Sequence, residues 1–468
     1  MVSVGRHENI TLLSYSEVEQ ISGYVGNFDV RVRKKPRYVV DDLCTGCGTC
    51  VEKCPWKKIP SEFELGLGMR PAIYFPFAQA VPRIPVIDTE NCVYFLKGKC
   101  KACEKFCPTG AIDFEQQDEV LDLEVGTIIL ATGFKDFKPD RAPEYGYPEI
   151  DNVLTGPEFE RLVSTSGPTS GEVRLVDGSK PQSVAVVHCV GSRSEEYHEY
   201  CSRVCCMYSL KLAHLIRDTF DAEVYEFYRD MRTFGKGYEA FYERIRDEGV
   251  EFIRFDNDFK VSKQNGRLLV STTDVYTGQR REVPVDMVVL STGLEPQEDQ
   301  AEVARIFGLS LNPDGFFLEK HPKLGPVETT TEGIFLAGSC QGPRDIPDTV
   351  AHSGAAAAAA LSLMDARYVT LEAFTAFIVE DKCGGCRTCE GLCPFGAIEM
   401  VDDEGHLVAH INQVICKGCG VCAAACPAGA AVQHGFRKEQ IMAEIIGVLA
   451  PNLKSEILDE ELQEEALA

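Results

Sequence analysis

The residues best suited to chemistry are cysteines, because 20 of the chain's 21 fall into five groups. Four groups are quartets that each end in Cys-Pro, and three of them follow the spacing CxxCxxCxxxCP without a departure. This spacing is typical of [4Fe-4S] cubanes, in which three close thiolates hold one cluster and the fourth ligates the other cluster of a pair. The quartets are Cys44, Cys47, Cys50 and Cys54; Cys92, Cys100, Cys103 and Cys107; Cys383, Cys386, Cys389 and Cys393; and Cys416, Cys419, Cys422 and Cys426. Zinc usually pairs two short knuckles and disulfides need an oxidising compartment, so iron-sulfur clusters are favoured.

The quartets come in two pairs, and each pair predicts one small ferredoxin domain with crossed ligation. In the C-terminal pair we expect one cluster on Cys383, Cys386, Cys389 and Cys426, and the other on Cys416, Cys419, Cys422 and Cys393. In the N-terminal pair the corresponding sets are Cys44, Cys47, Cys50 and Cys107, and Cys92, Cys100, Cys103 and Cys54. This second pair is less regular, because seven residues separate Cys92 from Cys100 and a Pro-rich segment, 60–85, divides its halves.

A fifth group, Cys189, Cys201, Cys205 and Cys206, follows the apolar run SVAVVH. Its four thiols could ligate a fifth cubane or could be buried structural cysteines, and spacing alone leaves both interpretations open. In a nucleotide-binding domain a glycine-rich phosphate turn would stand here, so we expect no NAD(P)H binding. Cys340 is isolated in sequence and is expected not to ligate iron.

Between the quartet pairs the chain reads as an α/β region. Four apolar runs flanked by glycine predict buried parallel strands, with helices such as Tyr208–Asp218 between them. The runs are 125–131, 183–188, 287–290 and 333–337. A doubly wound sheet is the expected fold class.

The ends of these strands carry a second signal. The tripeptides at Ala131 and at residues 291–293 resemble the two crossings between the FAD and nucleotide domains of thioredoxin-reductase-like flavoproteins, and 331–338 resembles that family's late flavin motif. Next, residues 348–349 could cap an Ala-rich helix whose N-terminal amides would face the flavin. A packing helix would explain the alanines but not the ordered series. The flavin-binding residues that the resemblance implies are Ala131, Thr132, Gly133, Thr292, Gly293, Gly338, Ser339, Arg344, Asp345 and Thr349.

One expected part of an FAD domain is absent from the sequence, namely the GxGxxG turn whose amides hold the pyrophosphate. Residues 10–16 and 28–34 look like strands from the middle of such a domain. The nucleotide half is therefore expected on a separate polypeptide, unless tight FAD binding has been lost. Ser339 or Cys340 replaces the usual acidic ribityl-binding residue, and Arg344 and Arg232 could tune a flavin, dock a partner or be solvated loop residues.

Together these stretches resemble HdrA, the flavin-containing iron-sulfur subunit of heterodisulfide reductase, and the match spans nearly the whole chain. Its most specific parts are residues 14–38, 44–112, 189–206, 230–242, 341–350 and the last quartet pair. The resemblance implies a thioredoxin-reductase-like core with one ferredoxin module inserted and one appended, and a fifth [4Fe-4S] cluster on Cys189, Cys201, Cys205 and Cys206.

The implied domains are an FAD-domain remnant (1–40), a ferredoxin insert (41–116), an FAD-domain strand and linker (117–180), a degenerate nucleotide-binding-like domain (181–285), the rest of the FAD domain (286–368), a second ferredoxin domain (369–434), and a C-terminal helix with an acidic tail (435–468).

The resemblance also implies an oxidoreductase subunit that relays electrons between FAD, ferredoxin and partner subunits by flavin-based bifurcation. The expected partners are a GxGxxG chain that shares the FAD, disulfide-reducing subunits, hydrogenase- or dehydrogenase-linked subunits, and ferredoxin. The alternatives are a flavin-free electron-transfer scaffold, or the same module in a complex for acyl-CoA ring reduction or quinone-linked sulfur metabolism. A net charge of -25 disfavours nucleic-acid binding, and no signal peptide or membrane span is read, so a cytoplasmic location is expected.

Overall fold

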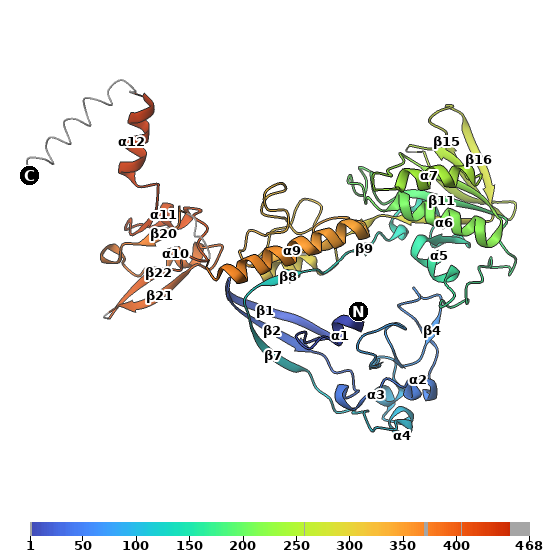
Figure 1. Cartoon of the computed structure of the whole chain (residues 1–468), viewed down its shortest axis with the longest axis horizontal. Helices are drawn as coiled ribbons and strands as arrows, with labels where there is room; N and C mark the ends of the chain where they lie inside the picture. The colour runs from blue at the N-terminus through green and yellow to red at the C-terminus, as the bar shows by residue number, and fades with distance from the viewer. Residues whose placement is uncertain (1, 257, 369–372, 404, 450–468) are drawn as a thin grey trace, which may run out of the picture.

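The computed structural model describes residues 2–256, 258–368, 373–403 and 405–449. The α/β lobe formed by the middle of the sequence, here called the central lobe, lies at one end of the molecule, and the C-terminal module lies at the other. The long helix α9 (Ile346–Ala366) lies between them (Figure 1). The N-terminal module lies below the central lobe in this view. The expected acidic tail falls within residues 450–468, which lie outside the described residues. No described helix has the length and apolarity that crossing a bilayer requires.

The central lobe is built on a five-stranded parallel sheet in the order β10-β17-β11-β12-β13. Every residue of β11 is buried, as a strand covered on both faces requires. The strands are β10 (Val153–Thr155), β11 (Ser183–Val190), β12 (Glu223–Tyr228), β13 (Glu251–Arg254) and β17 (Met287–Thr292), and the helices are α5 (Gly156–Val163), α6 (Cys205–Phe220) and α7 (Tyr238–Asp247). An antiparallel sheet of β14 (Lys260–Gln264), β15 (Arg267–Thr273) and β16 (Arg280–Val285) completes the lobe. The predicted doubly wound fold is confirmed.

The FAD-type region contributes two further sheets. Strands β8 (Ile128–Leu130) and β19 (Ile334–Leu336) pair in parallel, while β1 (Ser16–Tyr24), β2 (Asn27–Lys34) and β7 (Glu119–Val125) form an antiparallel sheet beside α8 (Gln300–Phe307). The two crossings to the central lobe pair as β9 (Lys135–Asp136) and β18 (Leu294–Glu295). The prediction of a strand over 10–16 is wrong, since the strand begins only at Ser16. The run 125–131 is two strands, because the chain turns at Gly126, whose carbonyl accepts from the N–H of Gly26.

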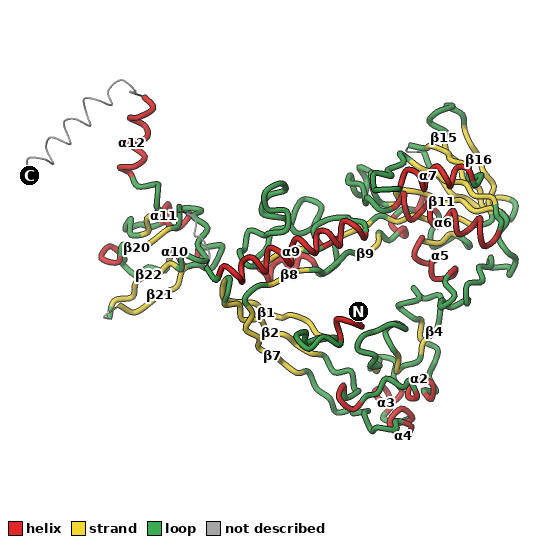
Figure 2. Tube along the Cα trace, viewed as in Figure 1, coloured by secondary structure: helices red, strands yellow, loops and turns green. Residues whose placement is uncertain are grey.

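Each ferredoxin module is a small fold built around its cysteines, and Figure 2 shows that the N-terminal one consists mostly of loops. That module contains the helices α2 (Thr49–Lys53), α3 (Val93–Lys97) and α4 (Ala102–Phe106) and the short strands β3 (Ile59–Pro60), β4 (Met69–Arg70), β5 (Ile73–Tyr74) and β6 (Val86–Ile87). The C-terminal module pairs β20 (Ala376–Ile378) with β23 (Ala431–Gln433) and β21 (Ile398–Asp403) with β22 (His406–Ile411), with helices α10 (Thr388–Leu392) and α11 (Val421–Ala425), and α12 (Lys438–Leu449) follows.

Candidate cluster and flavin sites

In the N-terminal module the thiols gather in two groups, each drawn from both quartets. Burial, together with the negative charges of Cys44, Cys107 and Cys47, raises the pKa of Cys50 to about 11. Burial raises the pKa of Cys103 to about 12, with added effects from Cys92, Cys50 and Cys54. Thiols that raise one another's pKa lie close together, so these sets have the arrangement that crossed ligation requires.

The C-terminal module repeats this arrangement. Burial raises the pKa of Cys422, and the charges of Cys416, Cys419 and Cys393 add to it. Backbone amides point at the sulfurs, as they do at cluster thiolates: Ala430 N–H donates to Cys426 Sγ at 3.2 Å and Ala397 N–H donates to Cys393 Sγ at 3.4 Å. Among the described residues, no three His, Cys, Asp or Glu side chains are placed to hold one metal ion, whereas a cubane binds each thiolate through a different iron.

A left-handed residue before or at the second cysteine shapes each of these loops. Gly46, Gly385 and Gly418 have positive φ, and a Cβ on them would lie 2.5–2.7 Å from a backbone carbonyl oxygen. Only glycine fits such a position without strain. The irregular quartet has no glycine there, and Cys100 itself adopts φ +83°. A glycine in the left-handed conformation thus precedes the second cysteine in each of the three quartets that keep the regular spacing.

The fifth group is assembled at the carboxyl end of the central sheet. Cys189 lies near the end of β11 with φ +60°, Cys205 and Cys206 begin α6, and Cys201 lies in the loop between them. Burial raises the pKa of Cys189 to about 12, and the charges of Cys206 and Cys201 contribute. Burial also raises the pKa of Cys205, and the charges of Cys189, Cys206 and Cys201 add to this effect. The structure therefore brings the four thiols together, and we call residues 189–206 the cysteine loop.

The cysteine loop occupies the place of a nucleotide-binding phosphate turn. A Cβ on Gly191 would lie 2.1–2.4 Å from ring atoms of Phe137, so the ring packs directly against the turn. Phe137 is itself buried and contacts the ring of Tyr197 edge-on, with 5.2 Å between ring centroids. The turn thus faces aromatic side chains rather than an open phosphate site.

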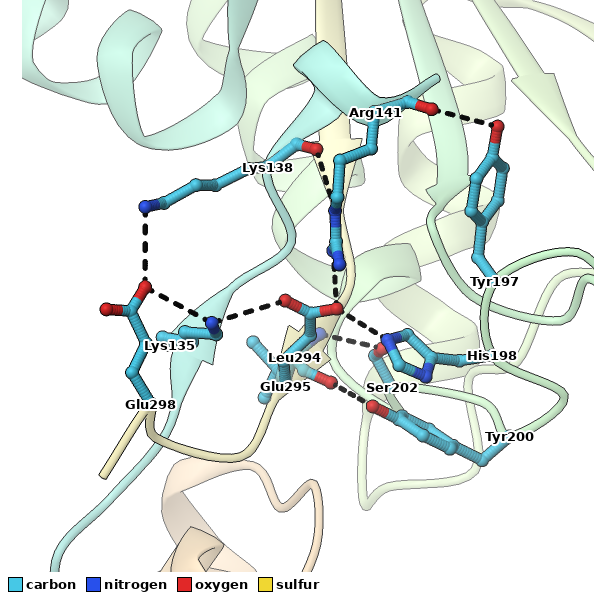
Figure 3. Close-up of polar contacts among 10 residues, drawn as sticks. All are labelled: Lys135, Lys138, Arg141, Tyr197, His198, Tyr200, Ser202, Leu294, Glu295 and Glu298. Carbon is cyan, nitrogen blue, oxygen red and sulfur yellow. Dashed lines mark hydrogen bonds and ion pairs between the residues drawn. The ribbon is translucent and has the colours of Figure 1, made fainter. Parts of the chain in front are cut away.

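A polar network that sequence reasoning missed joins the cysteine loop to the domain crossings (Figure 3). Glu295, only 5% exposed in its side chain, accepts from Arg141 Nη2 and contacts His198 Nε2, each at 2.5 Å. Burial alone would raise the pKa of Glu295, but Arg141 and His198 lower it overall. The Leu294 N–H donates to Ser202 Oγ at 2.9 Å, and Tyr200 OH donates to the Leu294 carbonyl at 2.8 Å. The loop is thereby fixed to β18.

The residues predicted to contact flavin fall in two places. The turn after β19 begins at Gly338, whose N–H donates to His352 Nδ1 at 3.0 Å, and it lies beside Leu130 and the residues 131–133 that follow β8. Ser339, Arg344, Asp345 and Thr349 lie in this turn, in the loop after it and at the start of α9. Thr292 and Gly293 lie instead against the cysteine loop, where a Cβ on Gly293 would meet Ser202 Oγ at 2.7 Å.

The start of α9 differs from the prediction. The helix begins at Ile346, three residues before Thr349, and Asp345 caps it by accepting from the Asp348 N–H at 2.8 Å. Asp348 instead pairs with Arg203 of the cysteine loop at 2.5 Å. The helix N-terminus, the Gly338 turn and the cysteine loop therefore meet in one region. Arg344 lies there too, and burial followed by the charge of Arg203 lowers its pKa, whereas Arg232 is exposed.

Comparison with known proteins gives matches over nearly the whole chain. The pyridine nucleotide-disulphide oxidoreductase family matches residues 208–358, a 4Fe-4S binding domain matches 37–57, and a 4Fe-4S dicluster domain matches 382–430. The chain is 47% identical to HdrA, the iron-sulfur subunit of the CoB--CoM heterodisulfide reductase of Methanocaldococcus jannaschii, over 97% of this chain and 69% of that protein. It is 49% identical to the HdrA-type subunit of the H(2):CoB-CoM heterodisulfide,ferredoxin reductase of Methanothermobacter thermautotrophicus, over 97% and 68%. Among solved structures, the thioredoxin reductase of T. acidophilum aligns with 69% of this chain and 94% of that chain at 12% identity, with a TM-score of 0.34.

Proposed function

Because the chain belongs to the HdrA family of heterodisulfide reductase subunits, we propose that it is the iron-sulfur flavoprotein subunit of a heterodisulfide-reductase-like complex. In this proposal it relays electrons between FAD, ferredoxin and partner subunits and takes part in flavin-based bifurcation. The observation that carries the proposal is the gathering of 20 cysteines into five four-thiol groups, one of which adjoins the start of α9. Five [4Fe-4S] clusters on these groups would serve as one-electron carriers.

We further propose that FAD is held partly by this chain. The Gly338 turn and the N-terminus of α9 would hold the ribityl chain and the isoalloxazine ring, and FAD would supply exchange between one- and two-electron steps. Among the described residues, strands β8 and β19 form a sheet of only two parallel strands, while Ile129 and the α9 side chains Ile346, Val350 and Leu361 are exposed. Such apolar surface is normally covered. A βαβ unit with a GxGxxG turn, supplied from outside these 468 residues, would cover it and provide the amides for the pyrophosphate.

A basic surface supports ferredoxin as a partner. Seven exposed lysines flank the thiol group that contains Cys103, and the exposed side chains of Trp56, Leu96 and Phe106 lie among them. The lysines are Lys53, Lys57, Lys58, Lys97, Lys99, Lys101 and Lys105. Because the whole chain carries -25, this concentration of positive charge is local, and it fits an acidic electron carrier.

The proposal is tested on the native complex purified anaerobically. We expect FAD in the complex, little FAD in this chain alone, and full FAD binding when a GxGxxG polypeptide is added. A complex that reduces ferredoxin without any flavin would support the scaffold alternative instead. Stoichiometric FAD retained by this chain alone after extensive gel filtration would contradict the shared site.

The basic surface has its own test. Changing Lys97, Lys99 and Lys101 to glutamate should slow ferredoxin reduction at low salt at least about tenfold and flatten its salt dependence. Matched reversals at the exposed lysines Lys236, Lys260 and Lys263, which lie on the central lobe, should leave the rate unchanged. Equal rates for both triple variants would exclude this docking surface.

A further inference from the structure

Three buried donors beside the cysteine loop have no hydrogen-bond partner among the described residues. They are Ser192 Oγ, Arg193 Nη1 and Thr292 Oγ1. A buried donor without a partner has lost its hydration with nothing in return, so native proteins rarely leave one unless a ligand or a water satisfies it. Three such donors around one group of thiols indicate a ligand with several acceptor atoms.

Each donor is held next to the cysteines. The Ser192 N–H donates to the Cys189 carbonyl at 3.1 Å, and Cys205 Sγ lies 3.7 Å from the carbonyl oxygen of Thr292. The two residues approach each other across the loop, because a Cβ on Gly293, the neighbour of Thr292, would lie 3.1 Å from Ser192 Cβ. Both hydroxyl-bearing residues are only 1% exposed. The hydroxyls therefore lie in the interior beside Cys189 and Cys205.

Arg193 is fixed by a carboxylate that serves two arginines. Asp230 accepts from Arg193 Nη2 at 2.5 Å with one oxygen and from Arg254 Nη2 at 2.6 Å with the other. This leaves Arg193 Nη1 buried and unpaired, although the side chain as a whole is 18% exposed. Burial by itself would lower the pKa of Arg193, but the hydrogen bond to Asp230 and the charges of Cys189 and Cys201 raise it. The guanidinium thus lies within electrostatic reach of two of the four thiols.

We propose that Arg193 Nη1 and the hydroxyls of Ser192 and Thr292 donate to the sulfur atoms of the cluster on the cysteine loop, and make it the most oxidising cluster of the chain. This inference rests on the proposed fifth cluster. Reduction adds one electron to a cubane, so donors and positive charge stabilise the reduced form and raise its potential. In the described parts of the ferredoxin modules, the groups that donate to sulfur are neutral, such as the backbone amides of Ala111 and Ala397 and the hydroxyl of Thr109.

The test is a potentiometric titration of the anaerobically reconstituted whole chain, with dithionite as the reductant and electron paramagnetic resonance as the readout. In the wild type, one cluster should be reduced at a higher potential than the others, and Cys205→Ala should remove that step. Arg193→Gln should lower that potential by at least ~59 mV, a tenfold change in the one-electron equilibrium constant, and leave the other clusters unchanged. Arg193→Lys, which keeps the charge, should shift it less.

Arg280→Gln is the matched control, because Arg280 pairs with Asp258 at 2.7 Å, on the antiparallel sheet away from the cysteines. It should change no potential. The inference would be overturned if the highest-potential cluster of Arg193→Gln were reduced at the wild-type potential, or if the potentials of all clusters shifted equally. If Arg193→Gln loses the fifth cluster, the same titration is made on Ser192→Ala and Thr292→Val, and the potential of the fifth cluster should again be lower than in the wild type. Unchanged potentials in both variants would overturn the inference. A wild-type content of only about sixteen irons would instead refute the fifth cluster itself.

Discussion

The ferredoxin modules and the cysteine loop both present groups of four thiols, but the apolar cores beside these groups differ in size. In the C-terminal module the buried apolar cluster is small and includes the ligand-type residue Cys422, and five of the other seven thiols pack against it. The cysteine loop lies instead at the end of a sheet whose two faces are covered by large apolar cores, centred on residues such as Val187 and Leu210. In the modules the clusters would form part of the core, whereas at the loop a core that is already complete would position the cluster. Metal binding should therefore be coupled to folding in the first case and much less in the second.

Iron removal should give the largest difference between the two regions. After chelation under oxidising conditions, we expect residues 44–112 and 376–433 to lose protection in hydrogen exchange, because their remaining cores are too small to fold alone. Strands β11 and β17 should remain protected. The comparison would be broken by equal loss of protection in the central sheet, or by modules that stay protected without iron. Protein carried through the same steps without chelator is the control.

A substitution in the core of the central lobe should instead destabilise that lobe and leave the ferredoxin modules intact. Leu210, which is fully buried in α6, packs in the core of the central lobe. Leu210→Ala should lower the free energy of unfolding of that lobe by about 3 kcal/mol, measured by denaturant titration, and leave the ferredoxin clusters in place. Leu324→Ala, at a position 84% exposed, should change it by less than about 0.5 kcal/mol. Loss of ferredoxin clusters in Leu210→Ala would show that the regions are not independent.

The sequence predicted what is local in this molecule. The cysteine spacing is set by short loops with a glycine such as Gly46, and β11 could be read because most of its residues are apolar or small enough to be buried. Glu295 could not be found in this way, since its partners Arg141 and His198 lie 154 and 97 residues away. The predicted start of α9 is wrong although a signal exists: Pro347 favours the first turn of a helix and makes Asp345 the natural cap.

Loss of the Glu295 carboxylate should have a moderate effect on the stability of the central lobe. Glu295→Gln should destabilise the central lobe by about 2 kcal/mol at pH 7, because hydrogen bonds to Arg141 and His198 lose their charge. The pKa of Glu295 is lowered in the folded state. Its contribution is therefore complete above the unfolded value of about 4.3 and is lost as the pH falls through the lower folded value. The difference between wild type and variant, followed by circular dichroism, should accordingly shrink below about pH 4, and a constant difference would contradict this assignment.

The smallest effect that we predict is that of pyridine nucleotides on the redox state of the clusters. The cysteine loop has replaced the phosphate turn and Phe137 packs on Gly191, so neither NADH nor NADPH should reduce the clusters of the chain. The measurement is the visible absorbance of the anaerobic protein after mixing, with dithionite as the positive control. Rapid bleaching by either nucleotide would mean that a nucleotide site exists elsewhere on the chain.

The most direct test of the account is the iron content of the anaerobically reconstituted chain, measured beside that of Cys205→Ala and Cys340→Ser. Five groups of four thiols predict about twenty irons in the wild type, about sixteen in Cys205→Ala, and no loss in Cys340→Ser. The substituted Cys205 belongs to the cysteine loop, whereas Cys340 is buried outside all five groups. A wild-type value that saturates at about sixteen irons and does not change in Cys205→Ala would contradict the fifth cluster, and with it the proposed one-electron carrier next to the start of α9.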